Sequence, residues 1–187
     1  MLKKRDLEMQ EVTSLYTLSI DEEVYPYVRQ KAASVDEFYF LTKQMIIAEE
    51  NRELISRTIL DEYEQPIGTI TLYDLYNDSG FLATWVGKPY FGKGYNKIAK
   101  HHFLNELFFS EQVETVFLKI NRQNVRSLKA IAKMPYTIHA NERYEETFRA
   151  INAAENKYEL FVIEKEHYEN YLHFETEKNL ATTEGVS

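Results

Sequence analysis

Two glycines separated by a single lysine lie just ahead of an amphipathic stretch, in the segment Phe91-Gly92-Lys93-Gly94-Tyr95. Glycine permits tight backbone turns, so successive N–H groups of such a loop can point into one concavity. At a helix N-terminus, those donors, the helix dipole and a nearby lysine together favour a bound pyrophosphate. The segment is neither a P-loop nor a dinucleotide fingerprint, because no Gly-Lys-Ser/Thr and no third glycine follow. An ordinary surface loop is the alternative interpretation.

Basic residues gather around this segment, although the chain as a whole carries a net charge of −8. Neither residues 79–105 nor residues 115–141 contain an Asp or a Glu. These two windows contain nine basic residues: Lys88, Lys93, Lys97, Lys100, Lys119, Arg122, Arg126, Lys129 and Lys133. A positive region in an acidic protein attracts a small polyanion that the net charge would repel. A solvated helix face would give the same pattern.

Composition excludes several classes of protein. The length of 187 residues and the 44% hydrophobic content are typical of one packed domain. Cysteine is absent, which excludes disulfides, thiol catalysis and cysteine-ligated metal. The acidic balance argues against general nucleic-acid binding. No apolar run of membrane-spanning length and no signal peptide are found, so we expect a cytoplasmic protein with no membrane partner. No His, Asp and Glu spacing predicts a metal site.

Hydrophobic patterns, turns and caps predict alternating strands and helices around the glycine segment. Strands are predicted over residues 9–19, 53–60, 67–73, 81–87, 113–120, 143–150 and 158–164. Helices are predicted over residues 21–28 and 35–50, from the Gly-rich stretch 87–94 to Phe109, and over 124–133. The predicted fold is an α+β sheet with helices on both faces, followed by a frayed tail over residues 176–187.

The stretch from Trp85 through Val86-Gly87-Lys88-Pro89-Tyr90 to Tyr95 resembles motif A of the GNAT acyltransferases. It is most similar to the branch that contains the ribosomal-protein N-terminal acetyltransferases. A second match is Asn124-Val125-Arg126-Ser127, which resembles the Asn-x-x-Ser helix of that branch. The resemblance implies one domain over residues 1–175, built on a twisted mixed sheet of about six to seven strands with about four helices. It also implies an enzyme that transfers the acetyl group of acetyl-CoA to a primary amine.

The resemblance also assigns the cofactor-binding residues. It implies that the strand at Trp85, Val86 and Gly87 hydrogen-bonds the pantetheine arm of CoA. The pyrophosphate would be wrapped by the loop Phe91, Gly92, Lys93, Gly94, Tyr95 and Asn96. Asn124 would contact the pantetheine, and Ser127 would lie near the thioester sulfur. From the residues alone, Asn124 is equally explained as a helix N-cap, Ser127 as a surface hydroxyl and Trp85 as a core residue.

The residues expected to carry proton transfer match the family less well. Ile131 stands where many relatives have the tyrosine thought to protonate the leaving thiolate, and Phe81 lies near the usual glutamate. Asn96 and Pro135 also replace the small residues of the family pattern. Amines are mostly protonated at pH 7, so a base is useful.

We name Ser127, Glu146 and Asp78 as catalytic candidates, with Asp74, Glu145 and His139 as further bases. The adjacent His101 and His102 are expected to pack or to face solvent. An amine acceptor and a homodimer are expected as partners, and the acidic remainder of the surface would suit a cationic amine. A non-catalytic acyl-CoA-binding regulatory module is the alternative function.

Overall fold

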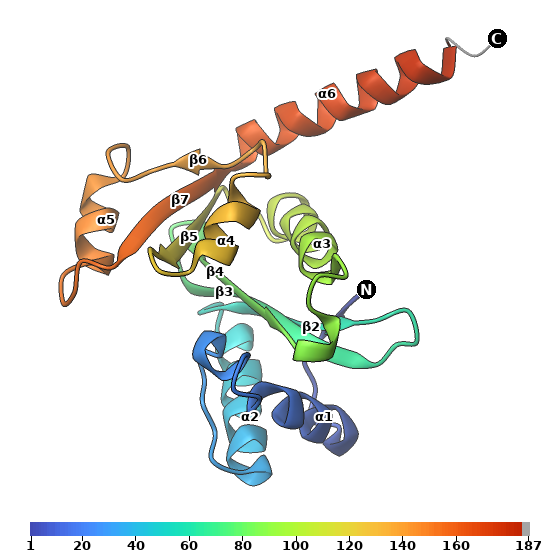
Figure 1. The fold of residues 1–187 in the computed structure, drawn as a ribbon, viewed down its shortest axis with the longest axis vertical. Coiled ribbons are helices and arrows are strands. Elements are labelled where there is room, and N and C mark those ends of the chain that lie inside the picture. Colours follow the sequence, from blue (N-terminus) through green and yellow to red (C-terminus); the bar gives the residue numbers. More distant parts are fainter. Residues whose placement is uncertain (185–187) are drawn as a thin grey trace. The chain divides into compact units, whose positions relative to one another are not determined.

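The computed structural model describes residues 1–184 of the chain (Figure 1). Within these residues it contains seven β-strands and six α-helices, with two short 3-10 helices. The chain divides into two compact units, Met1–Gln112 and Val113–Ser187. The mixed α/β class predicted from the sequence is therefore confirmed, with six helices in place of the expected four. None of the helices in the described part of the chain is long and apolar enough to cross a membrane.

The Met1–Gln112 unit is built on four antiparallel strands in the order β1, β2, β3, β4. Their bounds are Leu2–Lys4, Ile55–Leu60, Pro66–Tyr76 and Ser79–Val86. In the central pairs Arg57 lies opposite Ile70, and Thr69 lies opposite Trp85. Every residue of β2 is buried, because helices cover both faces of this sheet. Helices α1 and α2 lie on one face and α3 lies on the other (Figure 1).

The three helices of this unit follow from their apolar spacing and caps. Helix α1 (Met9–Ser19) buries Val12 and Leu15, which join a core cluster with Trp85 of β4. Helix α2 (Val35–Glu50) begins at Ser34, whose hydroxyl accepts the Glu37 N–H at 3.1 Å. Helix α3 (Tyr95–Phe109) buries residues at positions i, i+4, i+5, i+8 and i+9, which lie along one stripe. Those residues are Ala99, Phe103, Leu104, Leu107 and Phe108.

The Val113–Ser187 unit is built on three antiparallel strands with β7 in the middle. Strands β5 (Thr115–Asn121), β7 (Tyr158–Glu164) and β6 (Ile138–His139) pair so that Phe117 and Ile138 both lie opposite Val162. The remaining elements of the unit are the helices α4 (Val125–Ile131), α5 (Glu145–Ile151) and α6 (Lys165–Glu184).

Two predicted strands are wrong. Residues 9–19 form helix α1, since the buried residues Val12, Leu15 and Ser19 recur at helical spacing and not at every second position. Residues 143–150 fall largely in helix α5, where Glu145 pairs with Arg149 one turn later at 2.5 Å.

Other boundaries also differ from the sequence-based prediction. Strand β1 has no counterpart in that prediction, and the helix predicted over 21–28 is reduced to a 3-10 turn at Tyr25–Tyr27. The predicted tail over residues 176–187 continues helix α6 as far as Glu184, and residues 185–187 lie outside the described residues. Residues 165–184 contain no glycine and no proline, so no residue within α6 strongly disfavours a helix.

Candidate functional site

The glycine segment turns between β4 and α3 in the manner that the sequence predicts. A 3-10 turn at Lys88–Tyr90 precedes it. Gly92 and Gly94 then adopt left-handed backbone conformations, with φ of 74° and 87°. A Cβ atom added at either position would meet no heavy atom of the described residues within 4 Å. Both glycines therefore face open space, and the protein itself gives no packing reason for their lack of side chains.

The N-terminus of α3 has no capping side chain, because its N-cap residue is Gly94. The Gly94 carbonyl accepts the Ile98 N–H at 3.1 Å, as the first bond of the helix. The N–H groups of the first helical turn have no partner within a helix and need an outside acceptor. An α-helix of 15 residues also places positive dipole charge at this end. The arrangement can hold a phosphate by its backbone alone.

Two lysines near the loop, Lys88 and Lys93, differ in whether an acidic side chain pairs with them. Lys88 pairs with Glu23 at 2.7 Å, which offsets its charge within the unit. Lys93 lies 5.6 Å from the centroid of the Tyr90 ring and has no ion-pair partner among residues 1–184. Lys93 is therefore a cation of the loop that remains available to a phosphate.

Tyr95 fixes the start of helix α3 from the other side. Its hydroxyl donates to the Glu62 carboxylate, and this hydrogen bond raises the pKa of Tyr95 to about 12. The Tyr95 ring also meets the Tyr90 ring edge-on, with 5.7 Å between centroids. These contacts hold Tyr95, the first residue of α3, in place. Because Tyr90 precedes the glycines and Tyr95 follows them, the ring contact also links the two ends of the glycine segment.

The end of strand β4 that leads into the glycine segment is buried. The Trp85 side chain is 8% exposed and packs in the core with Val12 and Phe38. Val86 is buried as well, and the Gly87 N–H donates to the Ile67 carbonyl at 2.7 Å. The Trp85 side chain is therefore a core residue, and the Gly87 N–H is already used within the unit.

In the second unit, Asn124 is the N-cap of helix α4. Its side-chain oxygen accepts the Ser127 N–H at 3.1 Å, so the cap interpretation of Asn124 holds. The Asn124 amide nitrogen makes no hydrogen bond within residues 1–184, which leaves a donor for a ligand. The Ser127 hydroxyl likewise has no partner in that part of the chain, and Ser127 is half-buried. Ile131, by contrast, is 3% exposed and offers no proton donor.

The carboxylates predicted as bases, Asp74, Asp78, Glu145 and Glu146, are exposed. Asp78 lies in the turn between β3 and β4 with φ of 57°, at the opposite end of β4 from Gly87. Glu146 lies in the first turn of α5. Two alternatives are used in ion pairs, Asp74 with Arg29 at 3.0 Å and Glu145 with its i+4 neighbour.

The histidines considered from the sequence, His101, His102 and His139, each contact another side chain of their own unit. His139 contacts Glu159, with 2.8 Å between Nε2 and the carboxylate oxygen, at the edge of the β7–β6 pair. His101 and His102 meet each other on α3, with ring centroids 6.1 Å apart. Among residues 1–184, no three His, Asp or Glu side chains are arranged to hold a metal ion.

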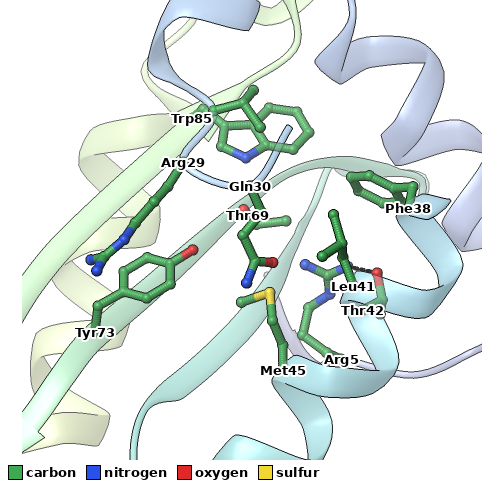
Figure 2. A pocket seen from close by; sticks show the side chains of 11 residues that line it. Arg5, Arg29, Gln30, Phe38, Leu41, Thr42, Met45, Thr69, Tyr73 and Trp85 are labelled. Atoms are coloured by element: carbon green, nitrogen blue, oxygen red, sulfur yellow. Dashed lines mark hydrogen bonds between the residues drawn. The ribbon is translucent and has the colours of Figure 1, made fainter. Parts of the chain in front are cut away.

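One feature of the first unit has no counterpart in the sequence-based prediction. A cavity beside Trp85 is lined by two arginines, Arg5 and Arg29, together with Tyr73 and apolar side chains of α2 (Figure 2). Arg5 follows the short strand β1, in a charged N-terminal segment whose sequence indicates exposure to solvent. Only its burial shows its importance, and no spacing in the sequence could have indicated that burial.

Comparison with known proteins agrees with the loop geometry. The GNAT acetyltransferase domain model matches residues 4–137. No curated protein matches the chain in sequence.

Several solved structures share the fold. A variant of spermidine N-acetyltransferase from Vibrio cholerae is 15% identical, with a TM-score of 0.67, over 90% of this chain and 96% of that one. FdhC, a nucleotide-linked sugar GNAT, is 16% identical, with a TM-score of 0.70, over 92% and 91%. The ribosomal-protein-S5-alanine acetyltransferase of Vibrio fischeri is 10% identical, with a TM-score of 0.67, over 88% and 92%.

At such identities these structures establish the fold and leave the acceptor open. The family match covers well over half of the chain and includes both the glycine loop and the Asn124 helix. The chain therefore belongs to the GNAT family of acetyltransferases, which use acetyl-CoA as cosubstrate.

Proposed function

We propose that this protein is an N-acetyltransferase that holds acetyl-CoA at the Phe91–Asn96 loop and acetylates a primary amine. The observation that carries the proposal is the pair of left-handed glycines, Gly92 and Gly94, whose missing side chains face open space at an uncapped helix N-terminus. A backbone that must approach a bound phosphate closely explains this choice of residues.

Different residues of the chain would bind the pyrophosphate and the pantetheine of acetyl-CoA. The N–H groups of residues 92–96 and the Lys93 ammonium would hold the pyrophosphate of acetyl-CoA, because neither those N–H groups nor the ammonium has a hydrogen-bond or ion-pair partner among residues 1–184. Backbone groups of Trp85, Val86 and Gly87 would hold the pantetheine, and the free amide nitrogen of Asn124 would add a donor. The bound thioester supplies an acetyl group that is already activated, so positioning can provide much of the barrier reduction.

The chemical step needs little more from the protein. The acceptor must present an unprotonated nitrogen, and Glu146 or Asp78 is proposed as the group that takes its proton. A strand N–H near Val86 is proposed to stabilise the developing oxyanion. The Ser127 hydroxyl is proposed to donate to the departing sulfur, because Ser127 lies one helical turn after Asn124 and its hydroxyl has no hydrogen-bond partner among residues 1–184.

We further propose that residues 1–175 act as one domain. The family match runs from residue 4 to residue 137 and so crosses the boundary between the two compact units. The proposed binding residues are also divided between the units, with the loop in the first and Asn124 in the second.

The alternative of a regulatory module that binds acyl-CoA without turnover rests on the buried Ile131, which leaves α4 without a tyrosine at that position. Calorimetry with CoA and a thiol-release assay with acetyl-CoA and a panel of amines distinguish the two functions. An enzyme releases CoA only when a suitable amine is present. Tight binding with no release across the panel would favour the module, and no binding at all would refute both.

A further inference from the structure

The cavity beside Trp85 lies wholly within the Met1–Gln112 unit. It is enclosed by α2, strands β3 and β4, and the segment that joins α1 to α2 (Figure 2). Its free volume is about 20 Å³, enough for one small polar group of a ligand. Arg5 and Arg29 are the charged residues of its lining, and no acidic side chain lines it. The charged groups that face the cavity are therefore both cations, and the nearest carboxylates, Glu11 for Arg5 and Asp74 for Arg29, lie outside its lining.

Arg5 is buried with most of its hydrogen-bonding capacity unused. Its side chain is 3% exposed. Of the five N–H donors of a guanidinium, it uses one, from Nη2 to the Thr42 hydroxyl at 3.3 Å. Its Nε has no hydrogen-bond partner among residues 1–184. The nearest carboxylate oxygen, on Glu11, is 3.9 Å from Nε and already accepts from the Thr58 hydroxyl.

A buried cation with unused donors is costly unless an acceptor meets it. Burial lowers the pKa of Arg5, although the charge of Glu11 opposes this change. A carboxylate is the acceptor that matches Arg5 best, because the group is planar and its two oxygens can accept two parallel N–H bonds from a guanidinium. A carboxylate of a ligand would therefore satisfy what the protein leaves unsatisfied.

Arg29 would extend the same recognition at the mouth of the cavity. Its side chain is 40% exposed and pairs with Asp74 at 3.0 Å. Its guanidinium also lies 4.1 Å from the centroid of the Tyr73 ring. Figure 2 shows the Tyr73 hydroxyl directed toward the interior of the cavity, where burial raises the pKa of Tyr73 and keeps the hydroxyl a donor. An anionic ligand that enters the cavity would contact the exposed Arg29 before it reaches the buried Arg5.

Trp85 connects the cavity to the proposed cosubstrate strand, because it forms part of the cavity wall and belongs to β4. We propose that the cavity binds the carboxylate of the acceptor, so that the substrate is an amino carboxylate and not a polyamine. This inference rests on the proposed acetyl transfer. In that reaction the acceptor nitrogen forms the new C–N bond as the thioester C–S bond breaks, and the proton lost from nitrogen ends on the released thiol.

The chain carries its own reporter for this cavity, because Trp85 is its single tryptophan. Its fluorescence can be followed while L-alanine, L-leucine or their carboxamides are added at constant ionic strength. Inorganic phosphate and spermidine serve as comparison ligands. We expect a saturable change with the two carboxylates and none with the carboxamides, phosphate or spermidine. This titration needs no acetyl-CoA, so it is independent of the proposed transfer reaction.

Variants identify the residues responsible. Arg5→Met should weaken carboxylate binding by about 10-fold to 100-fold, because it removes a charge-assisted bidentate partner. Arg5→Lys should restore part of the affinity. Arg29→Gln changes an exposed residue, so it tests the cavity even if Arg5→Met fails to fold. Lys43→Gln, an exposed residue of α2 outside the cavity lining, is the matched control and should bind like the wild type.

The outcomes separate this inference from the proposed function. Transfer to the amino acids but not to their carboxamides, with loss of that preference in Arg5→Met, supports the inference. Carboxylate binding that survives both Arg5→Met and Arg29→Gln overturns it, as does equal use of carboxamides or a preference for phosphate. CoA binding and transfer to polyamines alone would keep the proposed function and refute the carboxylate. Carboxylate binding without CoA binding would refute the proposed function and, with it, the assignment of the carboxylate to an acceptor.

Discussion

Replacing Gly94 by valine should damage CoA binding far more than it damages the fold. The φ of 87° at Gly94 lies in the left-handed region, where a residue with a Cβ costs about 1 to 2 kcal/mol and a β-branched one tends to the upper end. The added Cβ meets no heavy atom of the described residues within 4 Å, so no clash adds to that cost. The free energy of unfolding should therefore fall by about 2 kcal/mol.

The expected loss of affinity is larger because the Cβ would enter the space proposed for the pyrophosphate. If the phosphate is kept from two backbone N–H groups, at about 1.5 to 3 kcal/mol for each charge-assisted bond, about 3 to 6 kcal/mol of binding is lost. Each 1.4 kcal/mol is tenfold in affinity, so the dissociation constant should rise by about 100-fold or more. Calorimetry with CoA measures this change, and chemical unfolding measures the cost to stability.

A matched control separates strain from contact with the ligand. Asn77 also has a positive φ, of 45°, but lies in the exposed turn between β3 and β4, away from the loop. Asn77→Val should lose stability to a similar extent while CoA affinity stays at the wild-type value. A folded Gly94→Val protein with unchanged CoA affinity would show that the loop does not hold the pyrophosphate, and the central assignment would be wrong.

Three further predictions concern the second unit. Asn124→Ala should lower stability by about 1 kcal/mol, as loss of an N-cap does, and should also raise the dissociation constant of acetyl-CoA if the free amide nitrogen binds it; melting and calorimetry on the one variant decide. Ser127→Ala should lower turnover about 10-fold to 100-fold with little change in acetyl-CoA affinity, whereas unchanged kinetics would leave the hydroxyl without a catalytic role. Although burial opposes it, hydrogen bonds from His139, Arg122 and Asn141 lower the pKa of Glu159 to about 2. Because the folded pKa is depressed, the stabilisation by Glu159 is complete above the ordinary glutamate pKa of 4.5 and is lost as pH falls toward 2. Glu159→Gln should therefore flatten the acid limb of the unfolding curve, and an unaltered limb would contradict this.

The sequence predicted those parts of the fold where local chemistry and burial agree. Ser34 with acidic residues behind it marks the start of α2, and the predicted range of 35–50 matches the helix. The run from Tyr158 to Glu164 is likewise a strand over the predicted residues. The loop between β4 and α3 was predicted because only glycine takes its backbone angles without strain, so its residues carry the geometry directly.

The errors arose where tertiary contacts decide. Residues 9–19 carry few strongly apolar side chains, and Glu11 is buried because the Thr58 hydroxyl and Lys3 pair with its carboxylate. A buried glutamate disguises the helical stripe, since a pattern based on hydrophobicity counts it as a surface residue. The short α5 was misassigned for a related reason, because none of its residues is fully buried and its apolar pattern is weak. Pairing and partial burial of charges are properties of the folded chain.

The same reasoning explains why net charge pointed to a different acceptor from the one that the cavity favours. A charge of −8 acts over the whole surface, where water and salt screen it, so it governs encounter and solubility. Recognition in a desolvated cavity depends on the few groups that line it, where one guanidinium with unused donors outweighs many distant carboxylates. Arg5 has been withdrawn from water and given one long hydrogen bond. A cation held in this way selects an anion whatever the sign of the rest of the protein, and this is why the acceptor is inferred from Arg5 and not from the total charge.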